Sequence, residues 1–151
     1  MIVMPTVLVV YHSMSGNTRQ MAEAVAEGAR SVSGTEAVVK EGLQATTDDL
    51  LACDGVALGS PDYFSDMAGG MKDFFDRTYY PCQGRLQGKP CVTFGSAGGP
   101  PAVVIESLRK MAGKFKLQEA AAPVGSSGAP TAAVLQECRE LGQRLAEATQ
   151  S

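Results

Sequence analysis

The sequence contains no tryptophan, and only 6% of its 151 residues are aromatic. It has no run of lysine or arginine, and its formal net charge is -3. Such a balance argues against a nucleic-acid partner. No apolar stretch approaches the roughly 20 residues of a membrane span, and no basic region or small-residue cleavage site marks a signal peptide. We therefore expect a cytoplasmic protein that binds neither nucleic acid nor a membrane.

The four cysteines lack the spacing of a metal site. No pair forms the C-x-x-C pattern that zinc and iron–sulfur sites use, so no metal is expected. In the cytoplasm, disulfides are also not expected. Cys53, Cys91 and Cys138 lie in apolar stretches and are predicted to be small core residues. Cys82 lies in a loop-like stretch and is the predicted candidate for thiol reactivity.

Short apolar runs alternate with segments of helical spacing. Residues 6–11, 55–60 and 91–96 predict strands buried on both faces, and 35–40 and 117–125 predict weaker strands. Helices are expected from Thr18, over 46–52, over 67–78, from the prolines at 100 and 101, and from Pro130. This order predicts an α/β fold, a five-stranded parallel sheet with helices on both faces. With no linker or repeat in sight, we expect a single domain over residues 1–151.

Three polar loops follow the strongest predicted strands, at residues 12–18, 60–66 and 95–101. In a parallel sheet the carboxyl ends of the strands share one edge, and ligands bind at that edge. All three loops are rich in serine, glycine, aspartate or asparagine. Their shared position predicts one ligand site built from three loops.

The first loop offers neutral donors to an anion. Ser13, Ser15, Asn17 and Thr18 carry hydroxyl or amide groups, and Gly16 permits close backbone approach. The helix that follows directs its free N–H groups into the loop. From this loop alone, two interpretations stay open. It is either a phosphate cradle or a set of side chains that cap the helix.

Other phosphate sites on similar sheets are excluded by missing residues. The loop lacks the GK[ST] ending of a Walker motif. It also lacks the cysteine nucleophile of a phosphotyrosine phosphatase, because no cysteine precedes residue 53. A receiver domain needs acidic residues where this chain has Tyr11-His12 and Gly59-Ser60.

Two motifs resemble those of known flavoproteins. The segment "SMSGNT" (13–18) resembles the phosphate loop of flavodoxin-like proteins, [ST]-x-[ST]-G-x-[ST]. The segment "GSPDYFSDMAGGMKDFFD" (59–76) resembles a segment of WrbA-type NAD(P)H:quinone oxidoreductases and related NADPH-dependent FMN reductases. "LQGKPCVTFGSAGG" (86–99) is similar to the strand and glycine loop of the same family. The resemblance spans nearly the whole chain and implies a three-layer, doubly wound flavodoxin-like sheet of order 2-1-3-4-5.

The resemblance also implies FMN at the three-loop edge, with NAD(P)H as electron donor. The implied FMN-binding residues are Ser13, Met14, Ser15, Gly16, Asn17 and Thr18 around the phosphate, Ser60, Pro61, Asp62, Tyr63, Phe64 and Ser65 at the ring, and Ser96, Ala97, Gly98 and Gly99 along its other side. An aromatic neighbour, Tyr63 or Phe64, would favour a flat ring. The alternative is that Phe64 packs on the next helix and only Tyr63 faces the site.

Three functions are compatible with these residues. The favoured one is an oxidoreductase that passes electrons from NAD(P)H through FMN to a quinone or similar small acceptor. The second is a flavodoxin-type carrier for protein partners, although carriers tend to enclose the ring with aromatics from two loops and loop 95–101 has none. The third is a flavodoxin-like subunit without FMN. We further expect a homo-oligomer, either dimer or tetramer, and leave a chemical role of His12 open. Asp66 is predicted to cap a helix.

Overall fold

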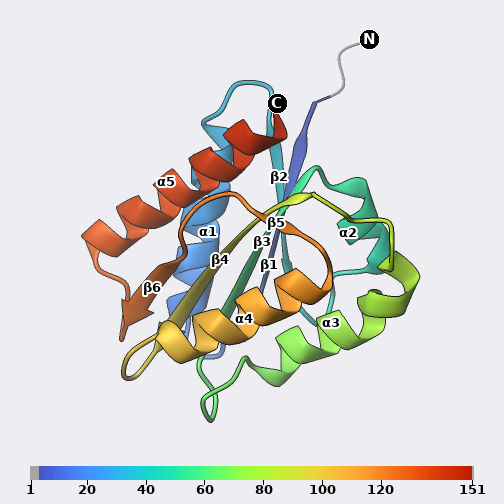
Figure 1. Cartoon of the computed structure of the whole chain (residues 1–151). Helices are drawn as coiled ribbons and strands as arrows, with labels where there is room; N and C mark the ends of the chain where they lie inside the picture. The colour runs from blue at the N-terminus through green and yellow to red at the C-terminus, as the bar shows by residue number, and fades with distance from the viewer. Residues whose placement is uncertain (1–3, 151) are drawn as a thin grey trace.

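The computed structural model describes residues 4–150 and contains one parallel sheet (Figure 1). Its strands are β1 (Thr6–Tyr11), β2 (Glu36–Glu41), β3 (Gly55–Pro61), β4 (Pro90–Ala97), β5 (Gln118–Glu119) and β6 (Val124–Ser127). The order is β2-β1-β3-β4-β5, and β6 also pairs with β4. The predicted doubly wound order 2-1-3-4-5 is therefore confirmed, with β5 and β6 together filling the fifth position.

Helices cover both faces of the sheet. One layer holds α1 (Asn17–Arg30) and α5 (Ala132–Thr149), and the other holds α2 (Thr47–Ala52), α3 (Gly69–Cys82) and α4 (Ala102–Lys114) (Figure 1). Because β1 is buried between these layers, Val7 and Val9 pack toward α1 and α5, whereas Leu8 and Val10 pack toward α2, α3 and α4. This two-sided burial explains why the central strands are uniformly apolar.

The predicted last strand, 117–125, is wrong as a continuous element. β5 pairs with the start of β4, and β6 pairs with its end through Phe94↔Val124. The intervening residues 120–123 belong to neither strand. Pro123 has no N–H to donate to the ladder, and three alanines before it supply little of the branched bulk that favours strands.

The predicted loop position of Cys82, the reason for naming it the candidate for thiol reactivity, is also wrong. Cys82 ends α3, is only 1% exposed, and belongs to the core between the sheet and α3 and α4. Burial raises the pKa of its thiol, which disfavours the reactive thiolate. The other three cysteines are buried core residues, as predicted, and burial raises the pKa of Cys53 to about 11.

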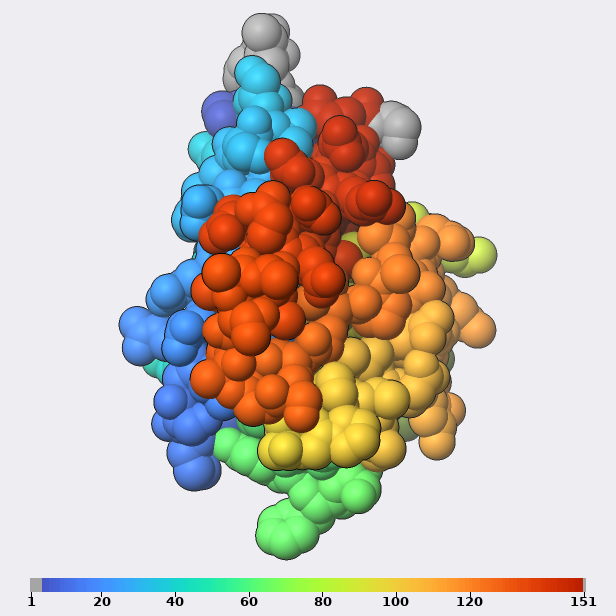
Figure 2. Space-filling model, turned by 90° about the vertical axis from the view of Figure 1, so that its left-hand side faces the viewer, coloured from blue at the N-terminus to red at the C-terminus, as the bar shows by residue number. Residues whose placement is uncertain are grey.

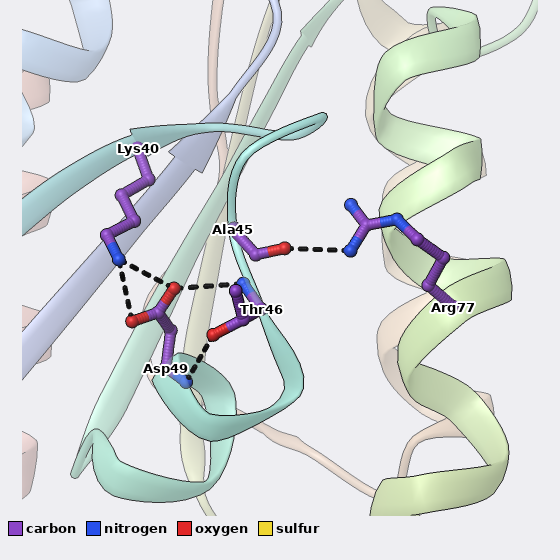
Figure 3. Close-up of polar contacts among 5 residues, drawn as sticks. All are labelled: Lys40, Ala45, Thr46, Asp49 and Arg77. Carbon is purple, nitrogen blue, oxygen red and sulfur yellow. Dashed lines mark hydrogen bonds and ion pairs between the residues drawn. The ribbon is translucent and has the colours of Figure 1, made fainter.

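Polar contacts fix the connection between β2 and α2 (Figure 3). Thr46 and Asp49 form a capping box at the start of α2, and the Lys40 ammonium lies 2.9 Å from both carboxylate oxygens of Asp49. Arg77 of α3 donates to the carbonyl of Ala45 at 2.9 Å and to that of Gly42 at 2.7 Å. These bonds hold the loop that follows β2 against α3, beside the carboxyl edge of the sheet.

We expect Asp49→Asn to destabilise the protein by about 1–2 kcal/mol at pH 7, because it weakens both the capping box and the ion pair. Burial alone raises the pKa of Asp49, but bonds from Lys40 and Thr46 outweigh it and lower that pKa below its ordinary value of 3.8. The carboxylate therefore stabilises the fold above about pH 4, and this contribution is lost as the pH falls through the lowered pKa. Urea unfolding between pH 2.5 and 7 measures both effects. Equal pH dependence in the variant and the parent protein would contradict this account.

Between residues 4 and 150, no helix combines the length and apolarity needed to cross a bilayer.

Candidate functional site

Three loops meet at the carboxyl edge of the sheet, where β1, β3 and β4 end side by side. The register places Tyr11 beside Gly59, and Pro61 beside Ser96. The Asp62 amide donates to the Ser96 carbonyl at 2.8 Å, which joins the second loop to the third. The sequence-based prediction that loops 12–18, 60–66 and 95–101 share one edge agrees with this arrangement.

The first loop leaves the amino end of α1 open. Gly16 precedes the helix with a φ of 99°, in the left-handed region that glycine adopts without strain. No side chain caps α1, and its first turn contains no acidic residue. Ser13 instead accepts a hydrogen bond from the Gly16 amide at 3.1 Å. The alternative that serine and asparagine side chains merely cap the helix is therefore wrong, and the amides at the start of α1 remain available to an anion.

Burial differs among the residues of this loop. Ser13, Gly16 and Asn17 are half-buried, whereas Ser15 and Met14 are exposed. Thr18 is almost fully buried, and its hydroxyl shares a 2.8 Å hydrogen bond with the hydroxyl of Ser96 on β4. That bond ties the first loop to the third. Sequence reasoning grouped Thr18 and Ser96 in one site but gave no signal that they contact each other.

The second loop is a tight turn that ends in an exposed aromatic. Asp62 and Met67 form an isolated bridge, and the Tyr63 amide donates to the Asp66 carbonyl at 2.9 Å. At the tip, Phe64 and Ser65 both lie in the left-handed region, with φ of 57° and 62°. The Phe64 side chain is fully exposed, so the alternative in which it packs on the next helix is wrong.

Ser60 and Asp66 hold the base of this turn in different ways. The buried Ser60 hydroxyl donates to the Pro61 carbonyl and accepts from the Ala68 amide, both at 2.8 Å. Asp66 was expected to cap a helix, and that expectation is wrong. Its carboxylate accepts from the neighbouring Met67 amide at 2.7 Å, whereas α3 begins at Gly69 without a side-chain cap. The extra residues between Asp66 and the helix separate the carboxylate from the first helical turn.

The His12 ring packs between the second loop and the start of α3. Its half-buried ring meets Tyr63 edge to face, with ring centroids 6.0 Å apart. The same ring packs against Gly70 near the start of α3, where a Cβ would lie 2.5 Å from His12 Nδ1. Tyr63 is half-buried, so its ring position depends on this packing. The glycine at position 70 is the sequence signal for it, but the partner of that glycine could not be read from spacing.

The third loop is open backbone. Ser96 and Ala97 are buried at the end of β4, whereas Gly98 and Gly99 are exposed, with no atom near the position of a Cβ. The Gly128 amide donates to the Ala97 carbonyl at 2.7 Å. The segment after β6 therefore adjoins the same edge. Nothing in the sequence indicated that the residues between 125 and 130 adjoin this edge.

Exposed apolar side chains surround the edge. Met14, Leu43, Phe64 and Val103 follow the carboxyl ends of four different strands, and each is at least half exposed. In Figure 2 the green segment around residues 60–68 projects beyond the rest of the surface. Within residues 4–150, no cluster of histidine, cysteine and acidic residues could hold a metal ion. The edge thus combines an open helix end, exposed backbone and an apolar rim.

A sequence model of the NADPH-dependent FMN reductase family matches residues 31–131. The chain belongs to this family. The match includes the second and third loops of the site but begins after the first loop. The first loop is covered by relatives that align over nearly the whole chain.

Relatives of this FMN reductase family member have two kinds of name. "Flavodoxin" of Aquifex aeolicus is 37% identical over 95% of this chain and 86% of its own length. "NAD(P)H dehydrogenase (quinone)" of Acidithiobacillus ferrooxidans is 43% identical, but over 57% of this chain and 54% of its own length. A flavodoxin structure from the domain Archaea superposes with a TM-score of 0.86 at 30% identity, over 97% of this chain and 99% of that one. A WrbA-like protein from Agrobacterium tumefaciens shares the fold, with a TM-score of 0.80 at 24% identity over 97% and 98%.

Proposed function

We propose that this FMN reductase family member passes electrons from NAD(P)H through bound FMN to a quinone-like small acceptor. FMN as the cofactor follows from family membership. The observation that carries the proposal is the open amino end of α1 beside Ser13, with no capping side chain and no acid in its first turn. A phosphate monoester fits that end because backbone amides and the helix dipole both favour negative charge there.

The residues of the first loop have different roles in holding the phosphate. The Ser13 hydroxyl orients Gly16, and the half-buried Asn17 adds an amide at the first helical position. Because the Thr18 hydroxyl is already bonded to Ser96, we assign Thr18 a positioning role through its side chain and a binding role through its backbone amide. Met14 and Ser15 stay at the exposed rim.

The second and third loops supply the two sides of the ring site. When bound, the flavin supplies the hydride and electron transfer. Tyr63, held by His12, provides an aromatic edge, and Phe64 at the exposed tip can lie over a flat ring. The open backbone at Gly98 and Gly99 leaves the opposite side accessible to a donor or acceptor.

The apolar rim supports a small, uncharged acceptor. Met14, Leu43, Phe64 and Val103 offer apolar surface to such a molecule at the mouth of the site. A flavodoxin-type electron carrier is the second candidate, favoured by the relative named flavodoxin that aligns over 95% of this chain. The relative named NAD(P)H dehydrogenase (quinone) aligns over only 54% of its own length, so its full activity does not by itself extend to this chain. The cytoplasmic location, the single domain and the homo-oligomer stay predictions.

Steady-state turnover distinguishes the two candidates. We expect the purified protein to take up one FMN per chain, and then to oxidise NAD(P)H with a soluble quinone. Absorbance at 340 nm measures the turnover, and a flavin-only reaction without protein is the control. Failure to take up FMN would reject both candidates. A flavin that is reduced only by a partner reductase, with no quinone turnover, would replace the enzyme with the carrier.

A further inference from the structure

A hollow lies far from the candidate site, between the carboxyl ends of α3 and α4. It has two adjoining parts of about 420 Å³ and 240 Å³, and both are lined by Tyr79 and Lys114. We call it the Tyr79 groove, and its lining includes Tyr79, Tyr80, Met111, Lys114, Phe115 and Lys116. α3 and α4 lie side by side on the same face of the sheet (Figure 1). Because these helices run back from the carboxyl edge, the groove lies at the opposite, amino edge.

Aromatic rings form the walls of the Tyr79 groove. The Tyr79 ring meets Tyr80 and Phe115 edge to face, with centroids 5.2 Å away in each case. Phe115 in turn packs against Phe75 at 5.4 Å. Tyr79 is therefore held in place, while Tyr80 remains 78% exposed. The fixed ring of Tyr79 beside the exposed ring of Tyr80 favours a planar, aromatic ligand.

The charge of the groove is positive. The Lys114 and Lys116 ammonium groups make no ion pair within residues 4–150, and both side chains are exposed. Asp76, the acid that also lines the groove, is neutralised by Lys72 at 2.7 Å. A cation near the end of α4 also favours the helix dipole, which accounts for Lys114 without a ligand. It does not account for the backbone at Lys116.

Lys116 occupies a position that normally takes glycine. Its amide donates to the Gly113 carbonyl at 3.0 Å, and the Leu117 amide donates to the Ala112 carbonyl at 3.1 Å. This pair of bonds is the Schellman motif, whose left-handed residue is usually glycine. Lys116 has a φ of 63°, so its Cβ is strained where glycine would not be. The side chain of this strained residue lines the groove.

We propose that the Tyr79 groove binds a planar aromatic carboxylate. The ring of the ligand lies against Tyr79, Tyr80 and Met111, and its carboxylate lies between Lys114 and Lys116. Both lysines line the smaller part of the groove, so the carboxylate is placed there. This site is separate from the proposed FMN site, and its test does not depend on turnover.

The test compares 2-naphthoate with its neutral analogue 2-naphthamide by calorimetry, on the full chain with FMN present in excess. We expect naphthoate to bind about tenfold more tightly than the amide, because hydrogen bonds from the ammonium groups are stronger to a carboxylate than to a neutral amide. Lys116→Ala is expected to weaken naphthoate binding about tenfold, and Lys116→Arg to retain it. Lys110→Ala, an exposed change on α4 outside the groove, should leave binding unchanged.

Lys116→Gly separates a binding role from a structural one. It should weaken naphthoate binding as Lys116→Ala does, yet raise Tm by about 2–4 °C because the strain at φ 63° is relieved. Equal binding of the two naphthalene compounds, or unchanged naphthoate binding in Lys116→Ala, would overturn the proposal. So would a dimer in sedimentation that binds no naphthoate and dissociates in Tyr80→Ser, since the groove would then hold a second copy of the chain.

Discussion

Replacing Gly142 by alanine is expected to destabilise the protein by about 3 kcal/mol or more, the largest stability effect that we predict. Gly142 lies where α5 crosses α1, and a Cβ there would lie 1.9 Å from the carbonyl oxygen of Val25. From the other side of the same crossing, a Cβ on Gly28 would lie 1.8 Å from the Arg139 carbonyl oxygen. Both obstacles are backbone atoms, so no side-chain rotation can make room. The two helices must move apart, which opens the core between them and the sheet.

Urea unfolding followed by circular dichroism measures this loss, and Gly113→Ala is the matched control. Gly113 is also helical, on α4, but no atom lies within 4 Å of the position of its Cβ. Alanine there should stabilise the protein by about 0.5–1 kcal/mol, because the helical propensity of alanine is higher. If Gly142→Ala unfolded within 1 kcal/mol of the parent protein, the close crossing of α1 and α5 would be contradicted. A shift in FMN affinity should accompany the loss, since α5 holds α1 and the open end of α1 forms the phosphate cradle.

The same glycines show where sequence reasoning reaches its limit for the fold. The runs 6–11, 55–60 and 91–96 could be identified as strands because burial on both faces demands apolar residues at every position. The role of Gly28 could not be read in this way: it lies inside α1, which continues to Arg30, and it is the point of contact with α5. That contact depends on a partner more than 100 residues away in the chain. Local patterns carry no information about it.

The predictions for Cys82 and for the last strand were wrong for a related reason. Pro81 and the polar residues after it are typical of a loop, but the burial of Cys82 in the core keeps α3 helical to its end. In 117–125 the pairing is fixed by β4, which takes up β5 at its start and β6 at its end. In both places tertiary contacts outweigh local propensity.

For the candidate site, the sequence predicted which loops meet but not how their side chains point. Polar loops after parallel strands must share an edge, so the grouping follows from topology alone. The exposure of Phe64, the bond between Thr18 and Ser96, and the contact of His12 with Gly70 all depend on exact backbone angles and distances. Phe64 and Ser65 both have positive φ, a backbone conformation that residues of these types rarely adopt. Nothing in the sequence therefore indicated this turn.

Asn17→Asp is expected to have the largest effect on FMN binding, a loss of about 100-fold, or about 2.7 kcal/mol. The two side chains have nearly the same shape, so the change replaces an amide donor with a negative charge at the first position of α1. A carboxylate there repels the phosphate that the cradle is proposed to hold. The same charge favours the helix dipole, so the protein without FMN should become more stable by about 0.3–1 kcal/mol. A gain in stability together with a loss of FMN affinity would show that Asn17 lies at a binding site. If Asn17 only capped the helix, Asn17→Asp would raise stability and leave FMN affinity unchanged.

The matched control for this change is Gln118→Glu, which adds the same charge at the exposed strand β5, paired with the start of β4 and far from the carboxyl edge. Fluorescence quenching of FMN gives both affinities, and thermal unfolding without FMN gives both stabilities. We expect Gln118→Glu to change FMN affinity less than twofold, since exposed charges beyond about 10 Å are largely screened at 0.1 M salt. FMN binding by Asn17→Asp at the affinity of the parent protein would show that the cradle lies elsewhere. A loss shared by both variants would point to net charge rather than to position, whereas a loss confined to Asn17→Asp places the phosphate at the open end of α1.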